Sequence, residues 1–471
     1  VTVPGPFAVT GNVSIAVPAP GLLTTVSDPA DGAGAAPFTV SSAVITSTQG
    51  GAVSVDTSTG AFTYNPPAGY DGADSFTYQV CDSGVPGSAC TAATVNLTIS
   101  DMLWFIDNAA AAGDGRLSSP FNTLAAFQAV NDGVGNHPVA GDNIFLNESA
   151  TAYVGPVTLL NNQKLIGQDA TASVATIAGI TLAPNSVALP VTNSGNGVIV
   201  TLTSATDAIR ISNAASNTLR GFTIGNVTAT GTGINMASGA TTFGTLTILD
   251  TGINTNGRAL NLTTGTLTAT FTGITSTGGA NNLNLNTIAG TSTLGTGALS
   301  GATGTAFNVS GGTTTLSYSG TLAQASASQR GLDVTNHSTG TLTLSGAITA
   351  SNGSGIGFSN ADGVYTLSGV VTLNGGDAGI DVSGGSAGMI TLANTGSVIT
   401  NPSGIAVDID GSSAGFTFSF AGNITKTNNA TTAIDVTNNT NGTISFTGTS
   451  KTLSTSTATA VNLATNTGST I

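Results

Sequence analysis

Three aspartates are the residues of this chain whose spacing best suits shared chemistry. Asp381, Asp408 and Asp435 are each flanked by two apolar residues, and they follow one another at intervals of 27 residues. If they occupy equivalent positions in successive repeats, their like charges lie close together and repel. A bound cation such as calcium, which prefers carboxylate oxygens, would relieve this repulsion. The alternatives are a solvated polar ladder without a metal, or an offset register that separates the three.

Groups that could carry catalysis are few and scattered. Glu148 is the only glutamate beyond residue 101, and the two histidines, His137 and His337, are expected to be ordinary surface residues. Glycoside hydrolysis usually needs two carboxylates about 5 to 10 Å apart. No Ser/His/Asp arrangement, metal-ligand motif or nucleotide-binding fingerprint occurs in the sequence. We therefore expect a protein that is not an enzyme and requires no cofactor, with calcium as an optional ligand.

The composition excludes two classes of partner. Only 6% of the 471 residues are charged, the net charge is −14, and the eight Lys and Arg residues are dispersed. Nucleic-acid binding and attachment to anionic membranes both need clustered basic residues. No apolar run reaches the roughly 18 residues that span a bilayer. The absence of a signal peptide at Val1 is explained if the chain is a mature or excised fragment.

An apolar, polar, apolar triplet recurs from about residue 208 and predicts the elements that position these side chains. First members of successive apolar pairs are separated by 25, 26, 23, 24, 25, 24, 24, 27, 27 and 27 residues. Two further short alternating runs follow each pair, so a repeat holds three strands. The pattern predicts a right-handed, three-sided parallel β-helix with about 25 residues per coil. The pairs are Ile209/Ile211, Ile234/Met236, Leu260/Leu262, Leu283/Leu285, Phe307/Val309, Leu332/Val334, Ile356/Phe358, Ile380/Val382, Val407/Ile409, Ile434/Val436 and Val461/Leu463.

The residue between the two members of each pair is expected to point outward. Such residues would form one column down a face, with amide hydrogen bonds between coils. The proposed outward ladder comprises Asn235, Asn261, Asn284, Asn308, Asp333 and Asn462, and the three aspartates named above continue it.

Residues 1 to 100 differ from the repeats and predict a small antiparallel β-sandwich. The stretch holds no Lys or Arg, and alternating segments recur between turn signals. Cys81 and Cys90, the only cysteines, flank a Gly/Pro loop between two such segments. A disulfide across this hairpin is favoured over free thiols, and it indicates an oxidising compartment.

Two regions resemble known families. The stretch from Thr63 to Tyr78, with Tyr70-Asp71-Gly72 and Asp74-Ser75-Phe76 in it, resembles the cadherin-like, Ig-like repeats of large bacterial surface adhesins. The buried-type strand at 103–107, the Gly-Asp-Gly turn at 113–115 and an amphipathic helix near 122–131 resemble the N-terminal end of pectin-lyase-like β-helices. The expected domains are thus an Ig-like/cadherin-like β-sandwich over 1–100 and a β-helix with an N-terminal capping helix over 101–471.

Four aspartates of the first domain are candidate calcium ligands under that resemblance. Cadherin-like repeats sometimes bind calcium, and Asp28 and Asp31 with Asp71 and Asp74 would supply the carboxylates. Each lies next to Gly, Pro or Ser, so turn formation is the alternative explanation.

The resemblances imply an extracellular or cell-surface location. The expected role is a structural or adhesive stalk segment of a large bacterial surface protein, like an adhesin or autotransporter. Its expected partners are other surface-protein subunits, a host or substratum surface, or carbohydrate. Because the chain ends without a capping helix, one alternative is a filament, sheath or surface-layer subunit that stacks head to tail as a homo-oligomer. A second alternative is a polysaccharide-degrading β-helix enzyme.

Overall fold

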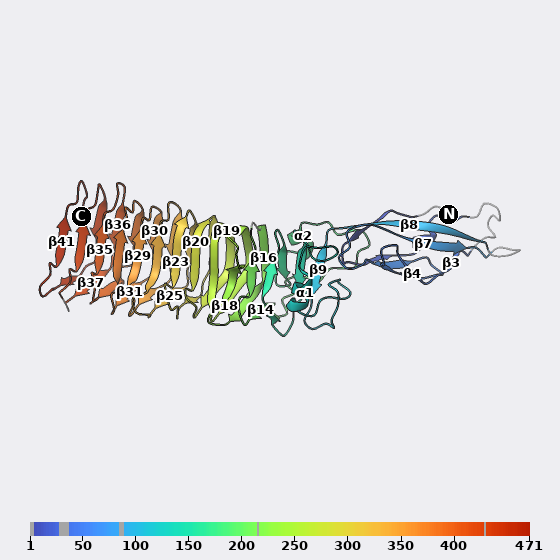
Figure 1. Cartoon of the computed structure of the whole chain (residues 1–471), viewed down its shortest axis with the longest axis horizontal. Coiled ribbons are helices and arrows are strands. Elements are labelled where there is room, and N and C mark those ends of the chain that lie inside the picture. The colour runs from blue at the N-terminus through green and yellow to red at the C-terminus, as the bar shows by residue number, and fades with distance from the viewer. Residues whose placement is uncertain (1–3, 28–36, 84–88, 214–215, 428–429) are drawn as a thin grey trace. The chain divides into compact units, whose positions relative to one another are not determined.

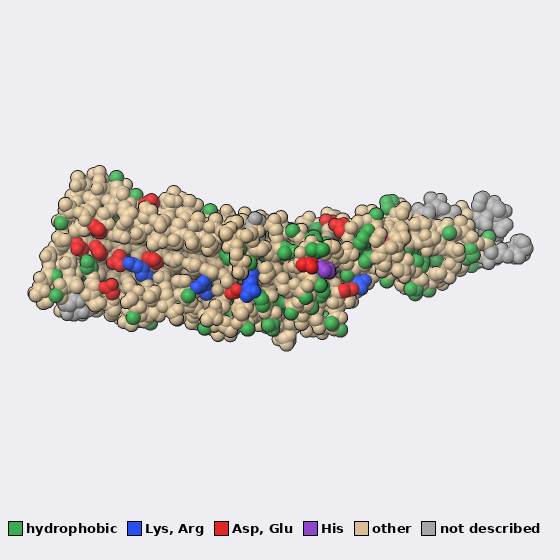
Figure 2. Space-filling model, in the orientation of Figure 1, with side chains coloured by type: hydrophobic (Ala, Val, Ile, Leu, Met, Phe, Trp, Pro, Cys, Tyr) green, Lys and Arg blue, Asp and Glu red, His purple; other side chains and the backbone are tan. Residues whose placement is uncertain are grey.

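The computed structural model describes residues 4–27, 37–83, 89–213, 216–427 and 430–471. In these ranges strands are the main regular elements, and they form two small sheets and then a long parallel ladder (Figure 1). Most of the visible surface of the ladder consists of backbone and uncharged polar side chains (Figure 2). The fold class is therefore all-β, with a parallel β-solenoid as its larger part, as the sequence pattern predicts.

Packing divides the chain into two compact units. Residues 1–151 and 162–200 form one unit, and residues 152–161 and 201–471 form the other. The boundary between the sheets lies at a different place from the boundary between the units. Strand β8 (Cys90–Ser100) belongs to one of the small sheets, and the next strand, β9 (Leu103–Ile106), begins the parallel ladder. The first unit thus contains both the sandwich and the earliest rungs.

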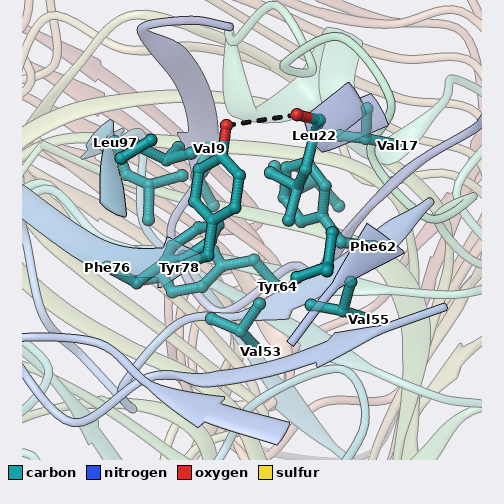
Figure 3. Packing of buried hydrophobic residues seen from close by; sticks show 14 of the residues in the cluster. Val9, Val17, Leu22, Val53, Val55, Phe62, Tyr64, Phe76, Tyr78 and Leu97 are labelled. Atoms are coloured by element: carbon teal, nitrogen blue, oxygen red, sulfur yellow. Dashed lines mark hydrogen bonds between the residues drawn. The ribbon is translucent and has the colours of Figure 1, made fainter. Parts of the chain in front are cut away.

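The N-terminal sandwich consists of two four-stranded sheets, in the orders β1-β8-β7-β3 and β2-β6-β5-β4. Alternate residues of β7 and β8 are buried, as a half-buried sheet requires. The aromatic side chains of Phe62, Tyr64, Phe76 and Tyr78 gather in the core, where the Tyr78 hydroxyl donates to the Leu22 carbonyl at 3.2 Å (Figure 3). The remaining elements are β1 (Phe7–Thr10), β2 (Ile15–Val17), a 3₁₀ turn (Gly21–Leu23), β3 (Thr39–Val40), β4 (Val44–Thr46), β5 (Ala52–Val55), β6 (Phe62–Asn65) and β7 (Gly72–Cys81).

The earliest rungs stack β9, β10 (Asn143–Leu146) and β13 (Lys164–Gly167) in parallel register. Helix α1 (Leu124–Val130) lies within the range predicted for a helix, and the Thr123 hydroxyl accepts from the Ala126 amide at 3.0 Å as its N-cap. A second short helix, α2 (Val174–Ala178), packs its apolar residues into a cluster with Leu103, Phe105, Phe145 and Ile166.

The solenoid has three strands per coil, because each strand from β20 to β38 pairs with the third strand that follows it. The first face consists of the strands that carry the apolar pairs, here called anchor strands. They are β12 (Val157–Leu159), β15 (Ile209–Ile211), β17 (Thr232–Met236), the start of β19 (Arg258–Ser276), β20 (Leu283–Ala289), β23 (Phe307–Gly312), β26 (Arg330–Thr335), β29 (Gly355–Ser359), β32 (Gly379–Ser383), β35 (Val407–Asp410), β38 (Ile434–Thr437) and β41 (Val461–Ala464).

The other two faces complete each coil. In the earlier coils they are formed by the short strands β11 (Tyr153–Val154) and β14 (Thr201–Ser204) and by long strands, β16 (Ser216–Val227), β18 (Gly244–Thr255) and the remainder of β19. In later coils one face holds β21 (Thr291–Thr293), β24 (Thr315–Tyr318), β27 (Thr341–Leu344), β30 (Val364–Leu367), β33 (Met389–Leu392), β36 (Thr417–Phe420) and β39 (Thr443–Phe446). The last face holds β22 (Ala298–Leu299), β25 (Thr321–Gln324), β28 (Ile348–Ala350), β31 (Val371–Asn374), β34 (Val398–Thr400), β37 (Asn423–Lys426) and β40 (Lys451–Leu453).

The register predicted from the apolar pairs is confirmed along the anchor face. Ile234 pairs with Leu260, Leu260 with Leu283, and the same one-to-one pairing continues to Ile434 and Val461. The first members of the pairs from Ile209 to Ile434 are at most 5% exposed. Each such side chain contributes about 1.5–3 kcal/mol by leaving water, so the stacked apolar columns are the main source of stability.

A left-handed corner recurs after the apolar pair in the coils from Leu260 onward, and sequence analysis missed it. The residue two positions after the second member of the apolar pair has positive φ in nine successive coils: Thr264, Thr287, Gly311, Asn336, Asn360, Gly384, Gly411, Asn438 and Thr465. Gly and Asn adopt this conformation most readily, whereas a β-branched Thr is strained there. The regular recurrence of Asn or Gly at this position was available in the sequence as a turn signal.

Candidate functional site

The outward residues of the anchor strands form one continuous line, here called the polar column. It runs through consecutive pairings from Arg210 and Asn235 to Asp435 and Asn462. Charged side chains on the face in Figure 2 follow a line along the solenoid. The column in order is Arg210, Asn235, Asn261, Asn284, Asn308, Asp333, Gly357, Asp381, Asp408, Asp435 and Asn462.

Four asparagines in the first half of the column form an amide ladder. Asn261 Nδ2 donates to Asn235 Oδ1 at 2.7 Å, Asn284 donates to Asn261 at 2.7 Å, and Asn308 donates to Asn284 at 2.8 Å. Each internal amide therefore both donates and accepts, and every bond points the same way along the solenoid. An amide can continue such a chain indefinitely because it carries both a donor and an acceptor.

Arg330 joins the two charged parts of the column across Gly357. Its guanidinium lies 3.4 Å from Asp333 and 2.9 Å from Asp381, which occupy the coils on either side of Gly357. A Cβ at position 357 would collide with this guanidinium. Glycine thus provides the space in which one cation serves two carboxylates.

The aspartate stack lies directly beyond this pair. Asp381 pairs with Asp408, and Asp408 with Asp435, on three consecutive coils. Burial, reinforced by the neighbouring charges of Asp381, Asp435 and Asp410, raises the pKa of Asp408 to about 6. Ionised carboxylates only accept hydrogen bonds, so the stack cannot continue the amide pattern. The ladder resumes where Asn462 Nδ2 donates to Asp435 at 2.9 Å.

Calcium binding by the stack gains no support from this geometry. Within the described ranges, no three His, Cys, Asp or Glu side chains converge in an arrangement that would hold a metal ion. The three aspartates follow one another on successive coils of the column. The calcium hypothesis stays a prediction.

The aspartates of the sandwich lie in separate environments. Asp28 and Asp31 fall outside the described residues, and Asp71 is exposed. Asp74 is buried, and its carboxylate accepts hydrogen bonds from the Tyr64 hydroxyl at 2.6 Å, the Thr48 hydroxyl at 2.8 Å and the backbone N–H of Gln49 at 2.9 Å. Burial alone would raise its pKa, but these hydrogen bonds and one from Ser47 hold the pKa below its usual value. Asp74 therefore ties together strands of the sandwich core.

The predicted disulfide is present. Cys81 and Cys90 face each other at the ends of the antiparallel strands β7 and β8, with Cα atoms 4.1 Å apart. The bond closes the hairpin whose loop sequence separates the two residues.

One prediction about the histidines is wrong. His337 is completely buried, and its ring nitrogens lie 3.0 Å from the Tyr365 hydroxyl and 3.1 Å from the Thr314 carbonyl. Burial lowers its pKa, so the ring is a neutral hydrogen-bonding member of the core. His137, by contrast, is exposed and lies 2.9 Å from Asp132. Sequence analysis had no signal for the difference, because both residues lie in polar turn-like segments.

A buried lysine was also missed. The Lys426 side chain is fully buried, and its Nζ donates at 2.8 Å to the carbonyls of Pro402 and Gly404. Burial lowers its pKa, with Asp377 acting in the opposite direction. The hydrogen bonds from Lys426 stabilise the turn that precedes the anchor strand β35, so the lysine has a structural role.

Comparison with known proteins identifies the first domain. Residues 3–98 match the family model described as a bacterial Ig domain. The N-terminal sandwich is a bacterial Ig-like domain. No curated protein and no solved structure matches the chain. The Ig-like domain and the β-solenoid that follows it suit a structural or adhesive extracellular protein, and the disulfide agrees with a surface or secreted location. Within the described residues, no helix has the length and apolarity needed to cross a membrane.

Proposed function

We propose that this chain is a non-catalytic stalk segment of a bacterial cell-surface protein, which extends from the cell and makes adhesive contacts along its solenoid. The observation that carries this proposal is the combination of a bacterial Ig-like domain with a solenoid whose rungs stay in register from coil to coil. Each coil adds roughly 4.8 Å of length, so the solenoid becomes longer with every repeat.

The solenoid is physically suited to an exposed location. Its strands pair from coil to coil, and most of its large apolar side chains are buried. Proteases need a locally opened segment, which stacked strands rarely offer. The surface carries few charges, and four of the five arginines are paired with aspartates. This arrangement leaves repeated hydroxyl and amide groups for contact with another surface.

The test of the surface role uses the bacterium that encodes the chain. Antibodies raised against the solenoid should label intact cells as strongly as permeabilised ones, and deletion of the coding region should reduce attachment to surfaces. Labelling that appears only after permeabilisation would refute the surface location. Unchanged attachment in the deletion strain would refute the adhesive role.

The non-catalytic part of the proposal has its own test. The purified chain should release no products from a panel of acidic and neutral polysaccharides, with or without calcium. Turnover that disappears in Asp381→Asn or Asp408→Asn would instead make the aspartate stack a catalytic site.

A further inference from the structure

We propose that a groove beside Arg258 binds a carboxylate-bearing sugar, such as a uronic acid residue of a glycan. This inference rests on the adhesive function proposed above and gives it a ligand class. The groove has a volume of about 530 Å³, within the range of small-ligand sites. It is lined by residues 229–231, Asn256, Arg258, 277–280, Gly301 and Thr303, most of which lie in the turns before successive anchor strands.

Arg258 differs from the other arginines in that no described carboxylate lies within ion-pairing distance of it, and the charge of Asp207 acts on it only from further away. Arg116 pairs with Asp114, Arg210 with Asp207, Arg220 with Asp250, and Arg330 with Asp333 and Asp381. The Nε atom of Arg258 is buried and makes no hydrogen bond to the described protein. Burial lowers the pKa of Arg258, and the charge of Asp207 opposes this only in part, so an anion that pairs directly with the guanidinium would stabilise it.

The same solenoid shows how an arginine at this position takes a carboxylate. Arg258 and Arg330 both lie two residues before the first apolar residue of an anchor strand, three coils apart. Asp333, three residues after Arg330, supplies a carboxylate from the polar column. The equivalent residue after Arg258 is Asn261, whose amide already donates to Asn235 and accepts from Asn284. Arg258 therefore lacks the carboxylate that Asp333 supplies to Arg330, and a carboxylate of a bound ligand would occupy the equivalent position.

The rest of the groove suits a sugar better than a simple anion. Thr230, Thr303 and Asn256 also line the groove, and their hydroxyl and amide groups are of the kind that sugar hydroxyls need as partners. Gly279 lies so close to the Arg258 backbone that an added Cβ would be 2.7 Å from its nitrogen, so the wall is bare backbone there. One guanidinium can bind one carboxylate through two parallel hydrogen bonds.

The test is calorimetric titration of the full chain with three hexasaccharides. The probes are oligogalacturonate, its neutral methyl ester, and a sulfated hexasaccharide without carboxylates. We expect oligogalacturonate to bind, the methyl ester to bind at least tenfold more weakly, and affinity to fall with added NaCl. Equal binding of the neutral ester, preference for the sulfated probe, or no binding at millimolar ligand would each overturn the proposal.

Variants locate the site. Arg258→Gln should weaken oligogalacturonate binding roughly 10- to 100-fold, and Arg258→Lys should restore part of it. Thr303→Val, which removes a hydroxyl at nearly constant volume, should weaken binding roughly two- to tenfold. Arg116→Gln makes the same charge change at a residue that does not line the groove, and it should leave affinity unchanged. Circular dichroism spectra and unfolding midpoints equal to those of the parent establish that each variant is folded.

The outcomes separate this inference from the proposed function. If Arg258→Gln binds oligogalacturonate as the parent does, the groove is not the site. If cells that carry Arg258→Gln still attach to surfaces while the deletion strain does not, the adhesive function stands and the sugar-acid ligand fails.

Discussion

Arg330 reaches past Gly357 to Asp381, so that Nη2 of the arginine lies 2.9 Å from a carboxylate two coils further along the solenoid. The contact couples three anchor strands, and it exists because the residue between the two aspartates has no side chain. About 37% of the Asp381 side chain is still exposed, so the ion pair is partly screened by water. The strength of the Arg330–Asp381 ion pair therefore depends on the position of the guanidinium next to Gly357.

Gly357→Ala is expected to destabilise the solenoid by about 1–3 kcal/mol, because the methyl group displaces the Arg330 guanidinium. Urea unfolding of the parent and the variant measures the change. In the double variant Arg330→Ala/Gly357→Ala the collision no longer exists, so the second substitution should cost much less than it does alone. Strictly additive effects in this double-mutant cycle would contradict the steric explanation.

Asp408 should make the solenoid more stable at mildly acidic pH. An unfolded aspartate has its pKa near 3.8, whereas the pKa of folded Asp408 is about 6. Between these values the folded state binds more protons, so the free energy of unfolding falls as the pH rises from about 4 to 6. Since Asp408 keeps contact with solvent, we expect an effect of about 1 kcal/mol.

Asp408→Asn isolates this effect. Its amide can donate to a neighbouring carboxylate, so the variant should be about 1 kcal/mol more stable than the parent at pH 7.5 and nearly equal to it at pH 4. The comparison uses the difference between the two proteins, because His337 acts in the opposite sense. Its lowered pKa makes the folded state lose stability as the pH falls below about 6.5. A pH-independent difference would rule out Asp408 as the source.

Asn284→Ala should destabilise the solenoid by about 1–2 kcal/mol. The substitution removes the bond that Asn284 donates to Asn261 and the bond that it accepts from Asn308. Thermal unfolding followed by circular dichroism measures the loss. Asn254→Ala, at an exposed position in β18, is the matched control and should have little effect. Equal effects of the two substitutions would mean that the amide ladder adds nothing to stability.

Reduction of the disulfide should destabilise the Ig-like domain and leave the solenoid unchanged. Cys81 and Cys90 close a short loop, for which loss of the cross-link costs about 2–3 kcal/mol in unfolded-chain entropy. Calorimetric scans with and without reductant should show one transition move to lower temperature. Cys81→Ser/Cys90→Ser should match the reduced protein and no longer respond to reductant. A reductant effect in that variant would point to another cause.

The apolar pairs were sufficient to specify how the rungs stack. Alternation with period two assigns each residue to the core or to the surface, and a shift of one residue would expose every member of a pair. Ile234, Leu260 and Ile434 therefore lie in register with their neighbours, and the residues between pair members align as the polar column. The Ig-like domain and its disulfide followed from local patterns of the same kind, because a strand and a tight hairpin are encoded within a few adjacent residues.

The partners of the charged and buried polar side chains depended on the folded coils. Arg330 finds Asp381 51 positions away, and His337 is enclosed by Tyr365 and Thr314 from the neighbouring coils. Repeats of 23 to 27 residues differ in their turns and in the lengths of their strands. These differences decide which side chains lie beside one another and which, like Arg258, line a groove. Period and polarity carry no information about that placement, because it arises from the packing of residues far apart in the chain.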